Sequence, residues 1–227
     1  MSELYHYGVL GMHWGVRRYQ PYGSGGYTPK DKARSVYRIA KKKEPKITRD
    51  VQDSLKKAGA KSYGLQHRIK TIDSIERKID KDMKEEGIEL DFAAGKIKDA
   101  VRYTSIANDQ NFVDSYNRFK DDMHQKGYDE VRCKNFFEDY KAGKVKHKSV
   151  QSVFQDEDGY QFEVQFQTPS SQHAKDLKIP IYEERRKVGI SKERAMELEQ
   201  QMTNLAEQVP YPKGIETIKS HDSLRHK

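Results

Sequence analysis

Apolar residues recur at helical spacings in two segments of the chain. In residues 48–61 they stand four and three positions apart, at Val51, Leu55 and Ala58. In residues 71–86 a longer apolar stripe precedes Gly87, a residue type that can end a helix. This stripe consists of Ile72, Ile75, Ile79 and Met83. The spacing predicts a helix over each segment, with one face packed against a core.

Strand-like alternation appears further along the chain. Residues 100–106 and 128–137 are predicted strands, with a helix marked by Phe112, Tyr116 and Phe119 between them. Residues 149–155 and 160–168 also alternate, and the Asp-Gly pair between them favours a hairpin turn. Helices are expected over 169–187 and 191–208. Strands interleaved with helices predict an α+β fold in which helices flank a mixed β-sheet.

Segments rich in turn-forming or charged residues divide the chain. Residues 1–44 are predicted to be a basic, Gly/Tyr-rich tag and linker, because a proline disfavours helix at the residue before it and Pro45 follows a basic run. Residues 45–208 are predicted to form the folded domain, with a Lys-rich loop over 138–148. Residues 209–227 are expected to be a loose tail.

Composition limits the size of the core and the range of functions. The chain has 227 residues, of which 34% are hydrophobic and 34% charged, so one modest core with extended arms is expected. The net charge of the chain is +8, and residues 1–44 contain nine basic and three acidic residues, so most of the excess positive charge lies there. The rest of the chain is therefore not a generic nucleic-acid binder. The single cysteine, Cys133, is expected to be an inert thiol without metal partners, and no membrane association is expected.

Basic residues cluster around the start of the predicted helix at 71–86. Arg68 and Lys70 precede it, and Ser74, Arg77 and Lys78 follow along its first turns. Residues 74 and 78 are one helical turn apart, so these cations can converge on a polyphosphate. A solvated basic helix surface would show the same spacing.

Polar side chains also share one face of the second hairpin strand. Glu163, Gln165 and Gln167 alternate with Phe162, Val164 and Phe166, which are expected to point into the core. A carboxylate beside an amide suits metal binding or proton abstraction, although a solvent-facing strand would look alike. Asp99 would join Arg102 on one side of its strand only through a β-bulge.

These residues together resemble the synthetase domain of RelA/SpoT alarmone synthetases over residues 68–168. Arg68, Lys70, Ser74, Ile75 and Lys78 follow the family pattern Arg-x-Lys-x-x-x-Ser-Ile-x-x-Lys position by position. Later segments are similar to the Lys-x-Asn-Gly-Tyr-x-Ser loop and the Glu-x-Gln strand of the family. The matching positions there are Lys146, Gln151, Ser152, Glu163 and Gln165.

The resemblance implies transfer of pyrophosphate from ATP to an acceptor. It assigns ATP binding to Arg68, Lys70, Ser74, Arg77, Lys78 and Arg102. It assigns Mg²⁺ binding to Asp99 and Glu163, catalysis to Glu163 and Gln165, and acceptor binding to Lys146, Gln151 and Ser152.

Four departures from the family pattern qualify these assignments. The family aspartate falls on Ile97, so Asp99 would act from one strand repeat later. Ser149-Val150 replaces the Gly-Tyr that stacks guanine, and stacking is worth roughly 1–3 kcal/mol per base. Phe154 and Gln167 replace a family His and Arg. The sequence therefore favours an acceptor such as another nucleotide or a tRNA 3′ end, or an inactive domain.

The N-terminal segment points to partners beyond nucleotides. Residues 6–18 resemble a short tag of phage head-associated proteins, so residues 1–20 are expected to contact phage capsid or portal proteins. A bacterial cytoplasmic or phage-head location and a growth-inhibiting effector role follow from that resemblance. The rivals are a non-enzymatic head component and an ADP-ribosyltransferase, and the order Glu-x-Gln disfavours the latter because its paired acid is missing.

Overall fold

The structure is a computed structural model that describes residues 26–143, 145, 147–187 and 189–223. The predicted tag at residues 1–20 and the predicted site residue Lys146 lie outside these ranges. The helices are α1 (Pro29–Lys57), α2 (Ile72–Glu86), α3 (Leu90–Gly95), α4 (Phe112–Gln125), α5 (Phe136–Lys141), α6 (Pro169–Arg185) and α7 (Lys192–Glu207), with short 3₁₀ turns at Leu65–His67 and Ile215–Thr217. The strands are β1 (Lys61–Tyr63), β2 (Arg102–Ile106), β3 (Asp129–Asn135), β4 (Val150–Gln155), β5 (Gln161–Gln167) and β6 (His221–Asp222).

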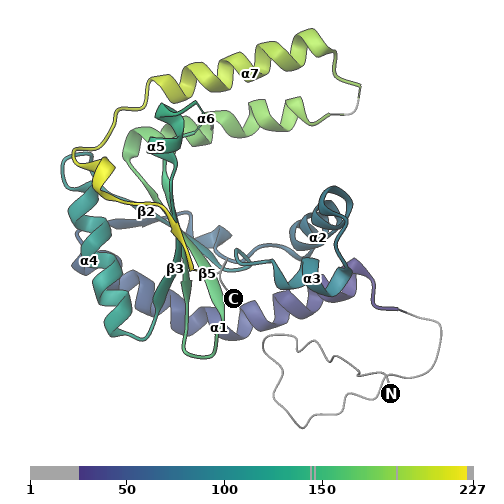
Figure 1. Cartoon of the computed structure of the whole chain (residues 1–227), viewed down its shortest axis with the longest axis horizontal. Coiled ribbons are helices and arrows are strands. Elements are labelled where there is room, and N and C mark those ends of the chain that lie inside the picture. The colour runs from purple at the N-terminus through teal and green to yellow at the C-terminus, as the bar shows by residue number, and fades with distance from the viewer. Residues whose placement is uncertain (1–25, 144, 146, 188, 224–227) are drawn as a thin grey trace, which may run out of the picture.

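The strands form one mixed sheet in the order β1-β2-β5-β4-β3-β6. Only β2 and β5 pair in parallel, and every other neighbouring pair is antiparallel. Helices α1 and α4 cover one face of this sheet, whereas α2 with α3 and α6 with α7 flank its other side (Figure 1). The expected α+β fold with a mixed sheet between helices is confirmed.

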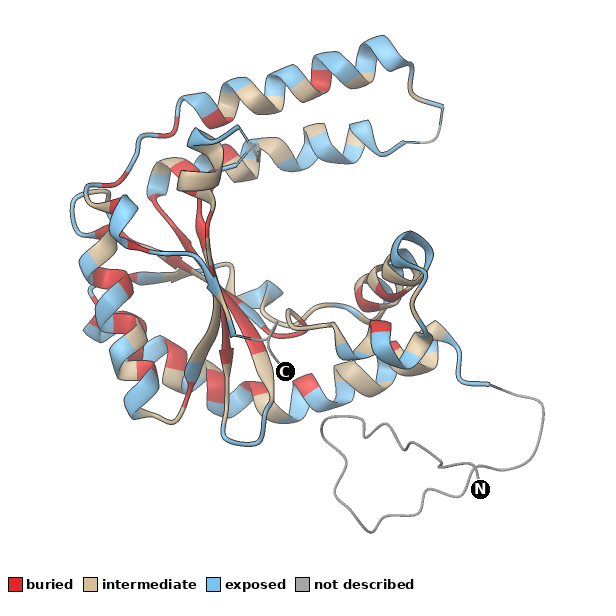
Figure 2. Cartoon of the chain, viewed as in Figure 1, coloured by how far each residue is buried: buried red, intermediate tan, exposed pale blue. Residues whose placement is uncertain are grey.

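Aromatic side chains fill the space between the sheet and helices α1 and α4. Phe119 of α4 packs edge-on against Phe154 of β4 and Phe166 of β5, with ring centroids 5.7 and 5.3 Å apart. Phe162, Val164 and Phe166 are all buried, as their alternation predicts. Buried residues accordingly concentrate in the strands and on the inner sides of α1 and α4 (Figure 2).

Helix α1 overturns the predicted break at Glu44–Lys46. It runs unbroken from Pro29 to Lys57 with Pro45 inside it, so the predicted boundary between residues 44 and 45 falls within one helix. An internal proline costs roughly 3 kcal/mol because it removes a helical hydrogen bond and crowds the preceding turn. Pro45 lies on the exposed side of α1, while Ile47, Val51 and Leu55 are buried on the inner side. Packing of that inner side therefore outweighs the local cost.

Two further predictions of irregular structure are wrong. The Lys-rich segment 138–148 begins within helix α5, which starts where the Asn135 side chain accepts hydrogen bonds from the backbone N–H groups of Phe137 and Glu138. The C-terminal tail is anchored, because Ile215 and Ile218 are buried and β6 pairs with β3. Apolar residues spaced too sparsely to show a period made this tail look loose.

Other local predictions are confirmed. Thr71 caps α2 by accepting a hydrogen bond from the Ser74 N–H, and Gly87 ends it in the left-handed conformation at φ 65°. Strands β4 and β5 form the expected hairpin, and Gly159 at φ 82° makes its turn. Among the described helices, none combines the length and the apolar character needed to cross a membrane.

Candidate functional site

The sheet face opposite α1 and α4 carries polar side chains in register. In one row across the sheet, Arg132 of β3, Val153 of β4, Glu163 of β5 and Arg102 of β2 are direct cross-strand neighbours. The next row consists of Lys134, Gln151, Gln165 and Thr104. Adjacent strands lie about 4.8 Å apart, so Glu163 is a direct neighbour of Arg102, whereas the buried Val153 separates it from Arg132. We call the seven polar residues of these two rows the polar face.

Glu163 occupies the centre of the polar face and is held by its neighbours. Its side chain accepts a hydrogen bond from Gln165 Nε2 at 2.5 Å, and Gln165 Oε1 accepts one from Lys175 Nζ of α6 at 2.6 Å. Glu163 is 8% exposed, so few of its atoms reach solvent. The Gln165 amide is fixed at both ends, which orients the carboxylate of Glu163 and links it to α6.

Arg102 lies directly across from Glu163 and is exposed. Its side chain forms no ion pair with any residue in the ranges that the structure covers, and its charge lowers the pKa of both Lys70 and Lys175, where burial is the larger cause. An exposed guanidinium near two partly buried ammonium groups can attract an anion, because an anion would relieve their mutual repulsion.

Asp99, Lys70 and Lys78 form a partly buried ionic cluster beside β2. The segment before α2 pairs with the segment before β2, because Lys70 N donates to Ala100 O at 2.9 Å and Arg102 N donates to Arg68 O at 2.8 Å. This pairing sets the Lys70 ammonium against one carboxylate oxygen of Asp99, while Lys78 Nζ lies 2.9 Å from the other. Burial by itself would raise the pKa of Asp99, but the charges of Lys78 and Lys70 outweigh it and lower that pKa to about 2.

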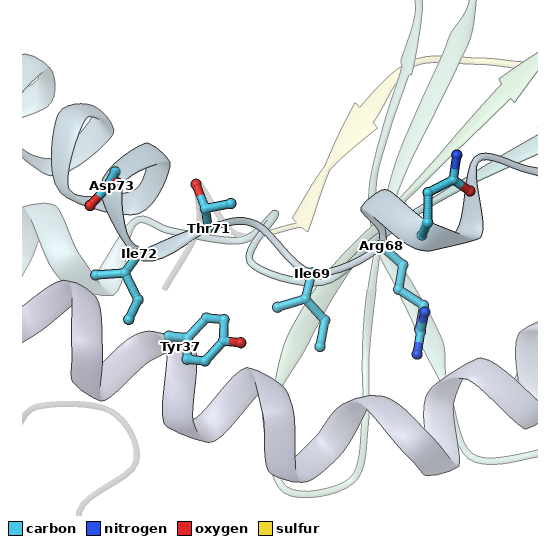
Figure 3. Close-up of a pocket in the computed structure, with 7 residues that line it drawn as sticks. Tyr37, Arg68, Ile69, Thr71, Ile72 and Asp73 are labelled. Atoms are coloured by element: carbon cyan, nitrogen blue, oxygen red, sulfur yellow. The ribbon is translucent and has the colours of Figure 1, made fainter.

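The remaining basic residues of the predicted cluster do not converge with Lys70 and Lys78. Arg68 turns toward α1, where it forms an ion pair with Glu44 and donates to Leu65 O at 2.9 Å. Figure 3 shows its side chain directed at α1. Arg68 and Tyr37 are among the residues that line a pocket of about 510 Å³ there. Arg77 donates to Ser74 Oγ at 3.1 Å on the exposed surface of α2. The structure thus brings together two of the four predicted cations.

The predicted acceptor residues divide in the same way. Gln151 lies on the polar face beside Gln165, as the resemblance implies. Ser152 points to the opposite, core-facing side of β4 and is fully buried, because neighbouring residues of a strand alternate between faces. The structure therefore does not bring Ser152 to the site.

A pocket of about 190 Å³ lies between the polar face and α6, and the sequence did not reveal its basic lining. We call it the α6 pocket, and its polar lining includes Lys148, Ser149, Gln151, Gln165, Lys175 and Lys178. Burial, with the charge of Lys148 adding to it, lowers the pKa of Lys178 to about 8. The hydroxyl of Ser149 is buried and has no hydrogen-bond partner among the described residues. The spacing of Lys175 and Lys178 on one helical face was the available signal.

Asp99 and Glu163 have the oxygen donors that Mg²⁺ prefers. They come from the segment before β2 and from β5, the two strands that pair in parallel, and Asp99 already faces two cationic groups. The chemistry of this donor set fits a hard divalent cation.

Comparisons with known proteins give different results for the first 21 residues and for the fold as a whole. Residues 1–21 match a family of unknown function (DUF7211). No curated protein matches the sequence. Several solved structures resemble the fold of the described residues.

A chain in the complex between the Type VI effector Tas1 and its immunity protein is 18% identical, over 81% of this chain and 100% of that one, with a TM-score of 0.50. The small alarmone synthetase 2 from Bacillus subtilis is 19% identical over 76% of this chain and 89% of its own, with a TM-score of 0.49. A GTP pyrophosphokinase family protein from Streptococcus pneumoniae is 15% identical over 76% and 85%, also at 0.49. The likeness to this chain of the Tas1 complex shows that the two chains share a fold.

Proposed function

We propose that this protein transfers pyrophosphate from ATP to a hydroxyl group of a nucleotide or of a tRNA 3′ end. The acceptor oxygen attacks the β-phosphorus of ATP, the bond from that phosphorus to the α,β-bridging oxygen breaks, and AMP leaves. The acceptor proton passes to a carboxylate. The observation that carries the proposal is Glu163 facing Arg102 across β5 and β2, beside the ionic cluster of Asp99, Lys70 and Lys78.

Lys70 and Lys78 supply the charge that an ATP triphosphate needs. Both ammonium groups lie against Asp99, and Arg102 lies close enough to Lys70 to lower its pKa. A triphosphate entering here exchanges one carboxylate partner for several phosphate oxygens, and it also meets the exposed guanidinium of Arg102. Positioning and charge compensation are the main requirements of phosphoryl-group transfer. Ser74 and Arg77 lie at the start of the same helix, but they do not converge with Lys70 and Lys78, so they carry less of this proposal.

Glu163 is the proposed general base. Its carboxylate is oriented by Gln165, whose amide is held in turn by Lys175. A base fixed in this way can accept the hydroxyl proton without reorganising during the reaction. Gln165 is therefore the positioning residue, and Lys175 supports it.

Asp99 and Glu163 would hold Mg²⁺, which supplies charge neutralisation between the phosphates when bound. The ammonium groups of Lys70 and Lys78 contact the Asp99 carboxylate, so both would have to release it for Asp99 to hold a metal. Arg68 would have to leave Glu44 to reach the nucleotide. Lys70 and Lys78 therefore carry the donor-binding proposal more strongly than Arg68 does.

The α6 pocket is the proposed acceptor site. Gln151 and Gln165 form its wall on the polar face, and Lys175 and Lys178 line it from α6. Its described lining contains no Phe, Tyr or Trp, and the imidazole of His147 is the one aromatic ring in it. We therefore propose an acceptor held through anionic and hydrogen-bonding groups, with Lys146 joining them.

A growth-inhibiting effector role and a location in the bacterial cytoplasm or the phage head remain part of this proposal. The support is the N-terminal tag resemblance, together with a fold shared with a chain of the Tas1 complex. The rival is an inactive head component that uses residues 1–20 to contact capsid or portal proteins. Deleting residues 1–20 would abolish recovery with particles under either reading, so only activity separates them.

The test is transfer of labelled β,γ-phosphates from ATP with Mg²⁺ to separate samples of ADP, GDP, GTP and bulk tRNA. Wild type is expected to label one acceptor, and Glu163→Gln to lower the rate by roughly 10²–10⁴-fold because it removes the base. Glu157→Gln, on the exposed turn of the same hairpin, is the matched control and should retain full activity. If no acceptor is labelled and Lys70→Met leaves ATP affinity unchanged, the catalytic proposal is refuted.

A further inference from the structure

Three polar side chains lie in one row on the core-facing side of the sheet, at the edge opposite β1. The register places Cys133 of β3 between Ser152 of β4 and His221 of β6. A β-bulge between Glu130 and Arg132 brings Glu130 to the same side as Cys133, although the two residues are three positions apart. One ligand atom each from Glu130, Cys133 and His221 lies within 4.8 Å of the other two.

We propose that Glu130, Cys133 and His221 bind a zinc ion. Thiolate sulfur, imidazole nitrogen and carboxylate oxygen are the donors that Zn²⁺ takes in proteins. Zinc bonds of about 2.0–2.3 Å place tetrahedral ligand atoms about 3.3–3.8 Å apart. His221 Nε2 already lies 3.7 Å from Glu130 Oε2. The thiol needs to move by no more than about 1 Å for the three ligand atoms to occupy three corners of a tetrahedron around the ion.

Two further hydroxyl groups suit the ligands of the proposed site, one beside Glu130 and one beside Cys133. Tyr116 Oη donates to Glu130 Oε1 at 2.8 Å and lies 3.4 Å from Cys133 Sγ. Ser152 is fully buried beside Cys133. Its hydroxyl is close enough to the thiol to lower the thiol pKa, but it forms no hydrogen bond of normal geometry with any described residue. A protonated thiol is a weak acceptor, whereas a thiolate accepts readily from the Ser152 hydroxyl, while the single proton of Tyr116 goes to the Glu130 carboxylate. The unsatisfied hydroxyl of Ser152 is thus explained by the metal-bound state.

The surroundings also decide how metal binding depends on pH. Burial, with the Glu130 carboxylate adding to it, raises the pKa of the Cys133 thiol to about 11, so the metal-free thiol is protonated at neutral pH. Zinc must displace that proton, and affinity therefore rises with pH. His221 has a side chain 42% exposed, which gives the ion a route from solvent.

The proposed ion would fasten the C-terminal segment to the sheet. Strand β6 has only two residues and pairs with β3 alone, and the chain before it packs through Ile215 and Ile218. A bond from His221 to an ion held by β3 crosslinks this short edge strand to the body of the domain. Metal binding is therefore expected to stabilise the folded state by an amount that grows with the logarithm of the free metal concentration above the Kd.

The test is cobalt titration of the chelator-treated full chain, followed by absorbance. Cys133 is the only cysteine, so a thiolate-to-cobalt charge-transfer band reports on this residue alone. One equivalent of Co²⁺ is expected to produce the band and one equivalent of Zn²⁺ to remove it. His221→Ala should weaken Co²⁺ binding by at least about 100-fold, since loss of an outer-shell partner already costs roughly 10–100-fold. Ser152→Ala should weaken it by roughly 10–100-fold.

His124→Ala is the matched control, because His124 is an exposed histidine paired with Asp129 elsewhere on the surface, and it should leave the titration unchanged. His221 is itself half-exposed, so its variant is expected to fold, and circular dichroism verifies this. A folded wild type without the band, or a band of equal affinity in His221→Ala, would overturn the proposal. Neither result depends on ATP or on transferase activity, so this site fails or stands independently of the proposed reaction.

Discussion

The Asp99 ion pairs should contribute a measurable, pH-dependent part of the stability of the fold. The charges of Lys78 and Lys70, acting against burial, hold the pKa of Asp99 at about 2, whereas the ordinary pKa of an aspartate is 3.8. At 1.36 kcal/mol per pKa unit, this difference corresponds to about 2 kcal/mol of stabilisation at neutral pH. Asp99→Asn should therefore lower the free energy of unfolding by about 2 kcal/mol at pH 7, with any loss of packing added.

The pH dependence of this difference separates charge pairing from packing. The folded-state pKa lies below the unfolded value, so the stabilisation is complete well above pH 4 and is lost as the pH falls toward 2. About half of it, or about 1 kcal/mol, should be gone at pH 3. Every other carboxylate titrates alike in both proteins, so its effect cancels in the difference.

Urea denaturation of wild type and Asp99→Asn at pH 7, 5, 4 and 3 measures this difference. The gap between the two free energies of unfolding should narrow by about 1 kcal/mol from pH 7 to pH 3. Asp114→Asn, which breaks an exposed pair with Arg118 on α4, should change stability by less than about 1 kcal/mol throughout. A gap that stays constant with pH would refute the reasoning, because it would assign the loss to packing alone.

Two other perturbations test separate parts of the structure. Pro45→Ala should raise the free energy of unfolding by about 1–3 kcal/mol, because it restores a helical hydrogen bond on the exposed side of α1. Urea denaturation measures this change. Unchanged or lower stability would contradict the unbroken helix. Acceptor affinity should fall as the pH rises through about 8, because Lys178 loses its charge there. Lys178→Met should bind the acceptor weakly at every pH, without that pH dependence. Lys192→Met, at the exposed start of α7, should match wild type. Parallel profiles for wild type and Lys178→Met would exclude Lys178 from the acceptor site.

Local features of the fold followed from the sequence because local chemistry determines them. Helix α2 begins after Thr71, which caps it, and ends at Gly87, which adopts the left-handed conformation. The Asp-Gly pair forms the hairpin turn. The alternation of β5 correctly separated Glu163 and Gln165 from the buried phenylalanines. These outcomes need no knowledge of which elements meet in space.

The remaining features depend on contacts between distant segments. The position of Arg102 across from Glu163 requires the parallel pairing of β2 with β5. The partner of Arg68 is Glu44, on a helix that the sequence appeared to break at Pro45. Cys133 looked isolated because His221 follows it at a long distance and a β-bulge supplies Glu130. Periodicity and spacing carry no information about such pairings.

The most direct test of the proposed reaction is the stoichiometry of its products. ATP labelled in its α-phosphate and ATP labelled in its γ-phosphate are incubated in parallel with protein, Mg²⁺ and the acceptor that becomes labelled. Pyrophosphate transfer predicts equal amounts of AMP and labelled acceptor, with both falling together in Glu163→Gln and neither changing in Glu157→Gln. Formation of ADP in place of AMP, or AMP without labelled acceptor, would contradict transfer of pyrophosphate by this site.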